Sequence, residues 1–485
     1  MDPRLARVLA ALPPRAVVTD PGELAPHLLD WRGHKRGVAH GLVRPASTEE
    51  VQALVIAAAR DGVALVPQGG NTGLVGGSVP EPEPDRPTLL VSMTRMNRIR
   101  AVDPAGLSMV AEAGTVLTRV HEAAAAHGLA FPLSLGAKGS ATIGGLCSTN
   151  AGGTQVLRHG PMRALVLGLE AVLPDGSRLD QLRPLRKDST GYDIKQLLIG
   201  AEGTLGIITA AALKLVPAPR SRAVGWAALP SLEAALDLLA RLRARVGERV
   251  ESFEVMAGDG LELVVAHVPG ARAPVAGRHA WHALVELADA EAGLDLERGL
   301  TEALAQAMGA GLVADATVAQ SDAQAEAWWR LRETLPEAER REGPSLKNDV
   351  AVAVADVPAF DEAVRVALLG RFPGARPLVF GHLGDGNLHW NLRPPLGADP
   401  RAWLAAHGAE ARRLLDDVVV RFRGTISAEH GLGTAKAAEF ARVGDPGKQG
   451  AMRAIKAALD PLGIMNPGKL FPPEDGRVVA RRVAG

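Results

Sequence analysis

The chain has 485 residues, 47% of them hydrophobic and 22% charged, which is the composition of a globular protein too long for a single core. Lysine plus arginine and aspartate plus glutamate both number 54, so the zero net charge indicates neither a nucleic acid nor a membrane surface as partner. The single cysteine, Cys147, excludes an intrachain disulfide and a zinc ribbon, and no stretch of about 18 uncharged apolar residues predicts a membrane span. We therefore expect a cytoplasmic protein of two or three domains.

The first element with a clear start is a helix predicted over residues 45–60. Ser47 or Thr48 can cap it, two glutamates follow in its first turn, and apolar residues recur at the i, i+3, i+4 and i+7 spacing. The apolar run 63–66 then predicts a strand that leads directly into a loop. A ligand loop at the carboxyl end of a strand is typical of α/β units.

That loop, residues 67–80, reads PQGGNTGLVGGSVP and contains five glycines. Glycine lets the backbone approach a ligand closely, and successive N–H groups turned inward form a nest that binds anions such as a pyrophosphate. The alternative is a flexible surface loop, which glycine density alone would favour. What favours the ligand site is the recurrence of the pattern further along the chain.

Short strands at 89–91 and 108–111 and a helix over 115–128 are predicted before the next glycine-rich stretch. That stretch covers residues 135–153, and a third covers residues 199–207. Each lies next to a β-type run, and small and hydroxyl residues dominate the second. Three such loops favour one shared flat ligand over three unrelated surface loops.

The segments PQGGNTGLVGGS, GAKGSATIGG…NAGG and GAEGTLGI together resemble the FAD-binding domain of the vanillyl-alcohol-oxidase (PCMH-type) flavoproteins over about residues 40–218. The resemblance implies an α+β fold with a two-subdomain PCMH-type FAD-binding domain in residues 1–218. It implies that the first loop holds the FAD pyrophosphate, the second lines the isoalloxazine and ribityl chain, and the third closes the adenine side. The cofactor-binding residues implied are Gln68, Gly69, Gly70, Asn71, Thr72, Gly73, Gly76, Gly77, Ser78, Leu135, Gly136, Gly139, Ser140, Gly144, Gly145, Ser148, Asn150, Gly152, Glu202, Gly206, Ile207 and Asn466.

Some members of that superfamily attach the flavin covalently through histidine or cysteine. Cys147 follows Gly144 and Gly145, where close backbone packing is expected, so a buried small hydrophobic role is favoured for it over a flavin linkage. We expect non-covalent FAD.

The pattern changes around residues 217–219, which predicts a domain boundary. Residues 219–425 are expected to form a substrate or cap domain, in which a largely antiparallel sheet is flanked by helices. Residues 426–485 are expected to form a small helical segment that returns to the flavin domain. Helices are predicted at 231–246 and 293–308, and strands at 283–287 and 351–354.

Residues 380–391, FGHLGDGNLHWN, place His382 and His389 on either side of a Gly-Asp-Gly turn. Strands at 378–382 and 388–392 would form a hairpin that brings both imidazoles toward one point. A second glycine-framed turn, SAEHGLG, adds Glu429 and His430. A histidine pair alone would more often be structural, but two histidines and one carboxylate suffice for a catalytic divalent metal.

GHLGDGNLHWN and SAEHGLG resemble the C-terminal domain of FAD-linked D-2-hydroxy-acid dehydrogenases, which act on D-2-hydroxyglutarate, D-lactate or glycolate; the D-2-hydroxyglutarate dehydrogenases match best. The resemblance runs from about residue 40 to residue 469. The family also has a Trp-x-x-Arg-Glu helix and a lysine fifteen residues later, which this chain matches with Trp329-Arg-Leu-Arg-Glu333 and Lys347. By this resemblance the metal ligands are His382, His389 and Glu429, and zinc is the divalent metal expected for such ligands. The resemblance gives His430 as the catalytic base and Arg332, Lys347 and Asn391 as the substrate-binding residues.

One position departs from that pattern. D-2-hydroxyglutarate dehydrogenases tend to have threonine or serine four residues after the arginine, where this chain has Pro336. Proline cannot donate a hydrogen bond, so one contact to a distal carboxylate is missing. The departure bears on which substrate is used and leaves the reaction type untouched.

The resemblance implies oxidation of a D-2-hydroxy acid to the 2-oxo acid by hydride transfer to flavin N5, with D-2-hydroxyglutarate favoured over D-lactate or glycolate. A soluble acceptor such as an electron-transfer flavoprotein, or a quinone, would reoxidise the flavin, and a homodimer is left open. Two readings from other classes remain: a metal-dependent hydrolase whose glycine loops bind a nucleotide, and a non-catalytic flavin-binding protein.

Overall fold

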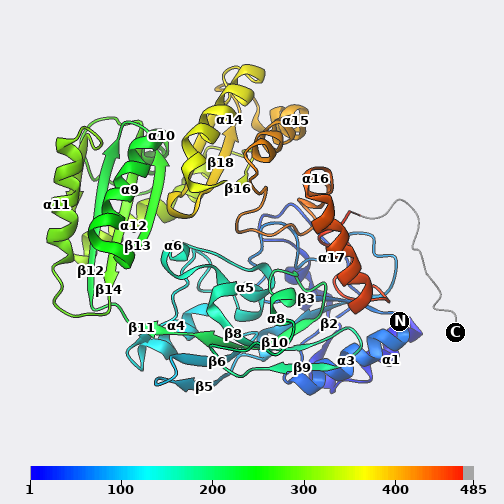
Figure 1. The fold of residues 1–485 in the computed structure, drawn as a ribbon. Helices are drawn as coiled ribbons and strands as arrows, with labels where there is room; N and C mark the ends of the chain where they lie inside the picture. The colour runs from blue at the N-terminus through cyan, green and yellow to red at the C-terminus, as the bar shows by residue number, and fades with distance from the viewer. Residues whose placement is uncertain (1, 473–485) are drawn as a thin grey trace.

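The computed structural model describes residues 2–472, so residues 473–485 of the expected C-terminal segment lie outside the described part. Figure 1 shows an N-terminal part on two small sheets, and a C-terminal part built on one larger sheet. Both helices and antiparallel sheets are present, and the expected α+β class is confirmed.

The first sheet has the strand order β1 (Val17–Val18), β2 (Leu42–Val43), β4 (Thr88–Ser92), β3 (Ala64–Gln68). Strands β2, β3 and β4 run parallel. Helix α3 (Thr48–Asp61) leads into β3; the Ser47 side chain caps its start and Gly62, at φ +67°, ends it. The predicted helix and the following strand are confirmed.

The second sheet is antiparallel, in the order β5 (Ile99–Asp103), β6 (Ser108–Glu112), β10 (Ile207–Lys214), β8 (Val166–Val172), β9 (Arg178–Gln181). A two-stranded ribbon, β7 (Leu129–Ala130) with β11 (Val216–Pro217), lies near the chain's exit from this part. One continuous apolar core joins both sheets. The helices around them are α1 (Pro3–Leu9), α2 (Pro21–Leu24), α4 (Leu117–Ala125), α5 (Ile143–Thr149), α6 (Val156–His159), α7 (Met162–Leu165) and α8 (Lys195–Leu198).

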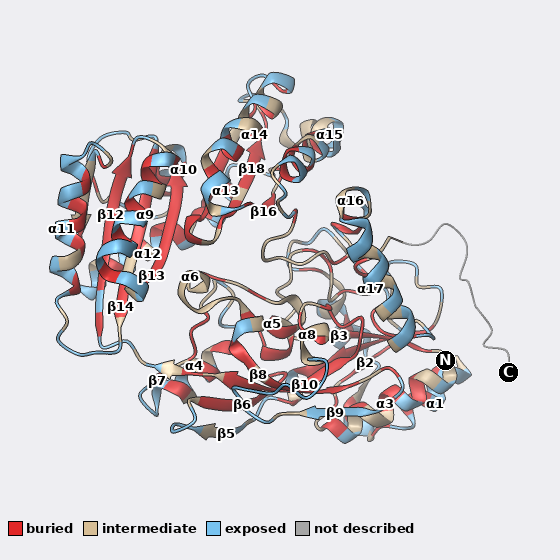
Figure 2. Ribbon diagram, viewed as in Figure 1, coloured by how far each residue is buried: buried red, intermediate tan, exposed pale blue. Residues whose placement is uncertain are grey.

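The C-terminal part has a seven-stranded antiparallel sheet whose two faces carry separate cores. Side chains alternate along β12 (Ser221–Leu229): Ala223 and Ala227 contribute to one core, and Val224 and Trp226 to the other. Helices α9 (Leu232–Val246) and α11 (Leu296–Gly309) bury one face toward the sheet and expose the other (Figure 2). The strand order is β15 (Asp315–Val318), β12 (Ser221–Leu229), β14 (Trp281–Asp289), β13 (Val250–Ala257), β17 (Arg376–His382), β18 (Asn387–Arg393), β16 (Asp349–Ala351).

The first core of this sheet receives α9 (Leu232–Val246), α11 (Leu296–Gly309), α14 (Val357–Arg371) and α15 (Pro400–Arg421). The second receives α10 (Gly258–His267), α12 (Asp322–Glu333) and α13 (Leu335–Arg341). The predicted helices over 231–246 and 293–308 and the strand over 283–287 are confirmed. The predicted strand over 351–354 is wrong beyond Ala351, because residues 354–356 turn into a 3₁₀-helix that leads into α14.

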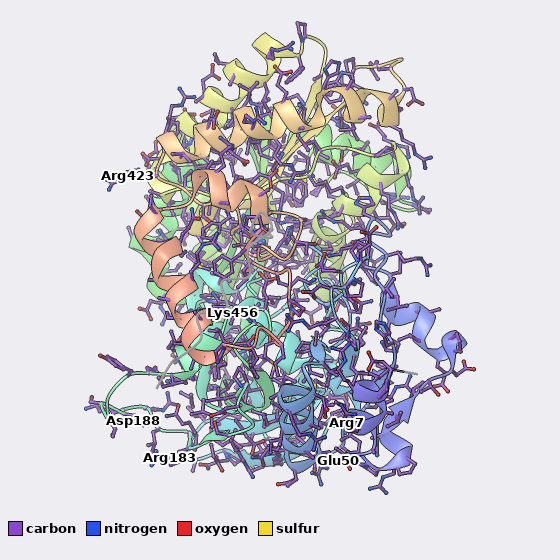
Figure 3. All side chains as sticks on the ribbon, turned by 90° about the vertical axis from the view of Figure 1, so that its right-hand side faces the viewer. Arg7, Glu50, Arg183, Asp188, Arg423 and Lys456 are labelled. Carbon is purple, nitrogen blue, oxygen red and sulfur yellow. The ribbon has the colours of Figure 1, made fainter. Side chains whose placement is uncertain are left out.

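The last elements, α16 (Ala437–Val443) and α17 (Pro446–Leu459), lead the chain back to the N-terminal part (Figure 1). Lys456, labelled on α17 in Figure 3, donates hydrogen bonds to the carbonyls of Thr204 (2.8 Å) and Met465 (2.9 Å). Beyond α17, the N–H of Leu65 donates to Ile464 and the N–H of Asn466 donates to Leu65, each at 2.8 Å. Residues 464–466 thereby extend the first sheet at the edge of β3.

Candidate functional site

The predicted histidine hairpin is present. Strands β17 and β18 pair antiparallel, with His382 opposite Asn387 and Phe380 opposite His389. Between them Gly386 has φ +81°, and a Cβ there would lie 2.1 Å from the carbonyl oxygen of Val352, so the turn requires glycine. The two imidazole rings lie 5.8 Å apart and nearly perpendicular.

The second motif, residues 427–433, is a loop held by a carboxylate from β16. The backbone N–H groups of Glu429 and His430 both donate to Oδ2 of Asp349, at 3.0 Å. The Ser427 hydroxyl closes the loop by donating to the carbonyl of Gly431 at 2.5 Å. Asp349 is buried, so these charge-assisted hydrogen bonds fix where the Glu429 and His430 side chains start.

The hairpin and the loop bring a possible ligand set together. Oε1 of Glu429 lies 3.4 Å from Nε2 of His382, and Oε2 of Glu429 lies 4.0 Å from Nε2 of His389. One donor atom from each of the three residues lies within 4.8 Å of the other two. Two imidazoles and one carboxylate are the donors of a catalytic zinc site with open positions.

The neighbour of His382 strengthens that fit. Its Nδ1 lies 2.6 Å from Oε1 of Glu254, which is buried on β13. A carboxylate on the second ring nitrogen fixes the tautomer and leaves Nε2 as the ligand atom. Burial works to lower the pKa of His382, but Glu254 and Glu429 outweigh it and raise that pKa to about 9. The two carboxylates therefore favour positive charge at His382, which suits a bound cation.

His430 lies on the far side of His389, and the two rings stack at 5.8 Å and 17°. Nδ1 of His430 faces Oδ2 of Asp349 at 3.5 Å, which leaves Nε2 without a partner among the described residues. Burial lowers the pKa of His430 to about 4, more than Asp349 raises it. The imidazole is therefore neutral near pH 7 and able to accept a proton.

Arg332, on α12, is buried beside the predicted metal ligand His382, because both contact Glu254. Its Nε donates to Oε2 of Glu254 at 2.9 Å, and its guanidinium lies over the Phe380 ring at 4.9 Å. The same carboxylate therefore holds a predicted metal ligand and a predicted substrate-binding residue. Among the described residues, the two terminal guanidinium nitrogens of Arg332 have no hydrogen-bond partner, so they can receive a carboxylate.

Lys347 and Asn391, the other two predicted substrate contacts, share one partner. Nζ of Lys347 lies 3.0 Å and Nδ2 of Asn391 lies 2.9 Å from Oε2 of Glu339. Oδ1 of Asn391 accepts from the backbone N–H of Asn348 at 3.2 Å.

The first glycine loop has the features of an anion nest. No backbone N–H of residues 69–78 donates a hydrogen bond to any residue in the range 2–472, and Asn71 has φ +52°. A Cβ on Gly70 would lie 1.8 Å from the carbonyl oxygen of Ser140, so the first and second loops touch through bare backbone. Gly73, Gly136 and Gly139 face open space. The free donors beside that space fit the diphosphate of FAD.

Several side chains among the predicted cofactor-binding residues hold the loops in shape through hydrogen bonds. Gln68 donates to the carbonyls of His27 and Ser78, and Asn71 donates to the carbonyl of Leu29 and accepts from the Ser78 hydroxyl at 2.9 Å. Asn150 ends α5 at φ +49° and accepts from the backbone of Arg163.

The remaining predicted cofactor-binding residues lie in the same loops or in the elements next to them. Thr72 and Gly76 belong to the first loop, Leu135 and Ser140 to the second, and Gly145 and Ser148 to α5, where Gly144 packs on Ala113. Ile207 begins β10, and Gly206 directly precedes it. Cys147, in α5, is fully buried, and burial raises the pKa of its thiol to about 12. An inert thiol is the role expected for it.

The glycine loops touch the ligand set directly. A Cβ on Gly152 would lie 3.1 Å from Oε1 of Glu429. The Glu202 carboxylate accepts the N–H groups of Leu432 (2.7 Å) and Gly433 (2.9 Å), and so holds the loop that follows His430. Asn466 donates to the carbonyls of Gly77 (2.9 Å) and Glu202 (2.6 Å). The structure therefore brings the predicted cofactor loops and the predicted metal ligands to one place.

Three buried carboxylates that organise this place were not predicted: Glu254, Glu339 and Asp349. Each lies outside the glycine-framed motifs. The signal that could have indicated two of them is a carboxylate inside an apolar strand, in VESFEVMA for Glu254 and in NDVAVAV for Asp349.

Residues 218–470 match the family model described as FAD linked oxidases, C-terminal domain, and residues 39–180 match the FAD binding domain model. The D-2-hydroxyglutarate dehydrogenase of Xanthomonas citri pv. viticola is 38% identical over 98% of both chains. The mitochondrial D-2-hydroxyglutarate dehydrogenase of Bos taurus is 39% identical over 95% of this chain and 82% of its own.

Among solved structures, p-cresol methylhydroxylase with bound substrate superposes with a TM-score of 0.74 over 97% of this chain and 96% of its own, at 15% identity. At that identity the likeness concerns the fold alone. No helix within residues 2–472 is long and apolar enough to cross a membrane.

Proposed function

The chain belongs to the FAD-linked oxidases, and on that premise we propose that it oxidises a D-2-hydroxy acid to the corresponding 2-oxo acid. The observation that carries the proposal is the contact between the second glycine stretch and the ligand set, at Gly152 and Glu429. This contact supports a flavin cradle beside two imidazoles, a carboxylate and a neutral histidine. The proposed division is a flavin domain in residues 1–218, a cap in 219–425 and a returning segment from 426.

Residues 69–73 and 76–78 would hold the FAD diphosphate without a covalent bond, and His382, His389 and Glu429 would hold a divalent metal, with zinc the first candidate. When bound, FAD supplies a hydride acceptor at N5 and the metal supplies a Lewis acid for the substrate hydroxyl.

His430 would take the hydroxyl proton at Nε2, because its Nδ1 faces Asp349. Asp349 orients that ring and holds the backbone on which it sits. Arg332 would bind the carboxylate next to the reacting carbon through its terminal nitrogens, with its plane fixed by Glu254 and Phe380. Burial of Arg332 and His382 would keep water away from their charges, and His389 and Glu429 are partly buried.

The names of the relatives put D-2-hydroxyglutarate first among the substrates to test. A second candidate is D-lactate or another monocarboxylate, and the pairing of Lys347 with Glu339 favours it. A soluble flavoprotein or a quinone would reoxidise the flavin. A cytoplasmic location remains part of the proposal, although relatives such as the Bos taurus protein carry a mitochondrial name.

The test is anaerobic mixing of the purified yellow protein with D-2-hydroxyglutarate, D-lactate, glycolate and D-malate, followed by absorbance. Bleaching of the oxidised flavin by one of these D-acids, and not by its L-enantiomer, supports the proposal. A colourless protein that cannot be reconstituted with FAD would favour a metal-dependent hydrolase. A yellow protein that no hydroxy acid bleaches would favour a non-catalytic flavin-binding protein.

A further inference from the structure

One buried carboxylate, Glu339, pairs with two of the three predicted substrate-binding residues. Glu339, 1% exposed in the last turns of α13, receives Lys347 and Asn391 on Oε2. The Ser345 hydroxyl donates to its Oε1 at 2.6 Å. Three donors around one buried carboxylate fix its position.

We propose that Glu339 determines substrate specificity, by taking the place that a second carboxylate of the substrate would occupy. The substrate class that fits is a D-2-hydroxy monocarboxylate with an uncharged side chain, such as D-lactate or D-2-hydroxybutyrate. The inference rests on the proposed D-2-hydroxy-acid oxidation and narrows it to this class.

The charges of the predicted substrate-binding residues support this assignment. Arg332 and Lys347 are the two cations predicted to bind substrate, and each is paired with a buried carboxylate, Glu254 and Glu339. Arg332 keeps two free terminal nitrogens for the substrate carboxylate at the reacting carbon. Lys347 offers one compact charge, and Glu339 already takes it.

A second substrate carboxylate would have to approach Lys347 beside Glu339. Two carboxylates that share one ammonium repel each other, and a partly buried site screens that repulsion less than water does. Displacing Glu339 instead would leave its charge buried without Lys347 and Asn391, which is costly. Both routes weaken binding of a dicarboxylate relative to a monocarboxylate.

The other groups around Glu339 do not replace the positive charge of Lys347 that Glu339 has neutralised. The Asn391 amide is oriented by Asn348 and Glu339, so its oxygen and one amide hydrogen are already used. Pro336, near the start of α13, has neither a backbone N–H nor a side-chain donor. An uncharged side chain loses nothing in such surroundings.

The test compares kcat/KM of the FAD-loaded wild-type protein for D-2-hydroxybutyrate and D-2-hydroxyglutarate, with an artificial electron acceptor. We expect the monocarboxylate to be favoured by about 10-fold or more. In Glu339→Gln, which keeps the shape and frees the charge of Lys347, we expect the ratio to move at least about 10-fold toward the dicarboxylate, mainly through its KM. Glu337→Gln, an exposed position on the same helix paired with Arg341, is the matched control and should leave the ratio unchanged.

A wild-type protein that prefers D-2-hydroxyglutarate would overturn the inference, and so would an unchanged ratio in a folded Glu339→Gln. If that variant does not fold, inhibition of the wild type by 2-oxobutyrate and 2-oxoglutarate decides, because the proposal requires tighter binding of 2-oxobutyrate. Failure of every hydroxy acid to reduce the flavin would instead remove the proposed function itself, which the bleaching assay detects separately.

Discussion

Glu254 lies between His382 and Arg332, with one carboxylate oxygen 2.6 Å from the imidazole and the other 2.9 Å from the guanidinium. This one buried side chain orients a predicted metal ligand and a predicted carboxylate-binding residue together. Any shift of Glu254 would therefore move both the His382 imidazole and the Arg332 guanidinium.

Glu254→Gln is expected to lower metal affinity by about 10- to 100-fold, because an amide holds the His382 ring less firmly and makes its Nε2 less basic. Metal content after dialysis against graded chelator measures the effect independently of turnover. Glu262→Gln, at an exposed carboxylate paired with Arg278, is the control. Equal metal retention in both variants would contradict the role given to Glu254.

His430→Asn is expected to keep FAD and to slow flavin reduction by about 10²- to 10⁴-fold, the range for loss of a general base. Stopped-flow absorbance under anaerobic conditions measures that step, and the flavin-to-protein ratio checks cofactor retention. His127→Asn, at an exposed histidine beyond α4, should behave as the wild type. A flavin reduction rate within a few-fold of the wild type would show that His430 is not the base.

Gly70→Ala is expected to abolish FAD retention. The added Cβ would lie 1.8 Å from the carbonyl oxygen of Ser140, so the first two glycine loops would have to separate. Gly450→Ala in α17 is the control, because its Cβ meets nothing within 4 Å and alanine favours the helix by about 1 kcal/mol. Flavin absorbance after gel filtration distinguishes the two variants. A yellow Gly70→Ala protein would show that the loops can separate without losing the nest.

Glu251 links the two parts of the molecule and gives a pH dependence. Its carboxylate, on β13, receives Gln155 (2.7 Å) and Arg158 (2.8 Å) from the start of α6 and lies 3.4 Å from His159. Burial works to raise its pKa, but His159 and Arg158 outweigh burial and lower the pKa from 4.5 to about 2. Because the folded state favours the ionised form, the stabilisation is complete above about pH 4.5 and is lost as the pH falls toward 2.

Glu251→Gln should therefore lower the free energy of unfolding by about 3 kcal/mol at pH 6, and the difference from the wild type should shrink as the pH approaches 2. Chemical denaturation followed by tryptophan fluorescence at several pH values measures this. The exposed Glu248→Gln provides a comparison without the inter-part contacts. A stability difference that stays constant between pH 6 and pH 3 would contradict the linkage.

The elements that the sequence predicted best are those with local signals. The helix α3 shows its cap and its apolar spacing, and the hairpin of His382 and His389 shows its Gly-Asp-Gly turn, so both were predictable without tertiary information. The strand predicted at 351–354 was wrong after Ala351, because a short apolar run does not distinguish a strand from the start of a 3₁₀ turn.

The carboxylates that organise the site were beyond local reasoning. Glu254 meets His382 across 128 residues, and Asn391 meets Glu339 across 52. Nothing near Glu339 in the sequence shows which cations it will face, since α13 reads as an ordinary charged helix. Sequence motifs indicated the predicted metal-binding and substrate-binding residues. The carboxylates that orient and neutralise those residues meet them only through the register of the sheet and the packing of α13.

Strand β3, which leads into the first glycine loop, pairs on one edge with residues 464–466. Ribosomes release a protein from its N-terminus, and early domains generally fold while later residues are still being made. Here the nest cannot take its final form until more than 380 further residues have emerged, since Asn466 must reach Gly77. We therefore expect the coenzyme to bind only after synthesis of the chain, and C-terminal truncations that remove Asn466 should yield apoprotein even though every glycine of the cradle is retained.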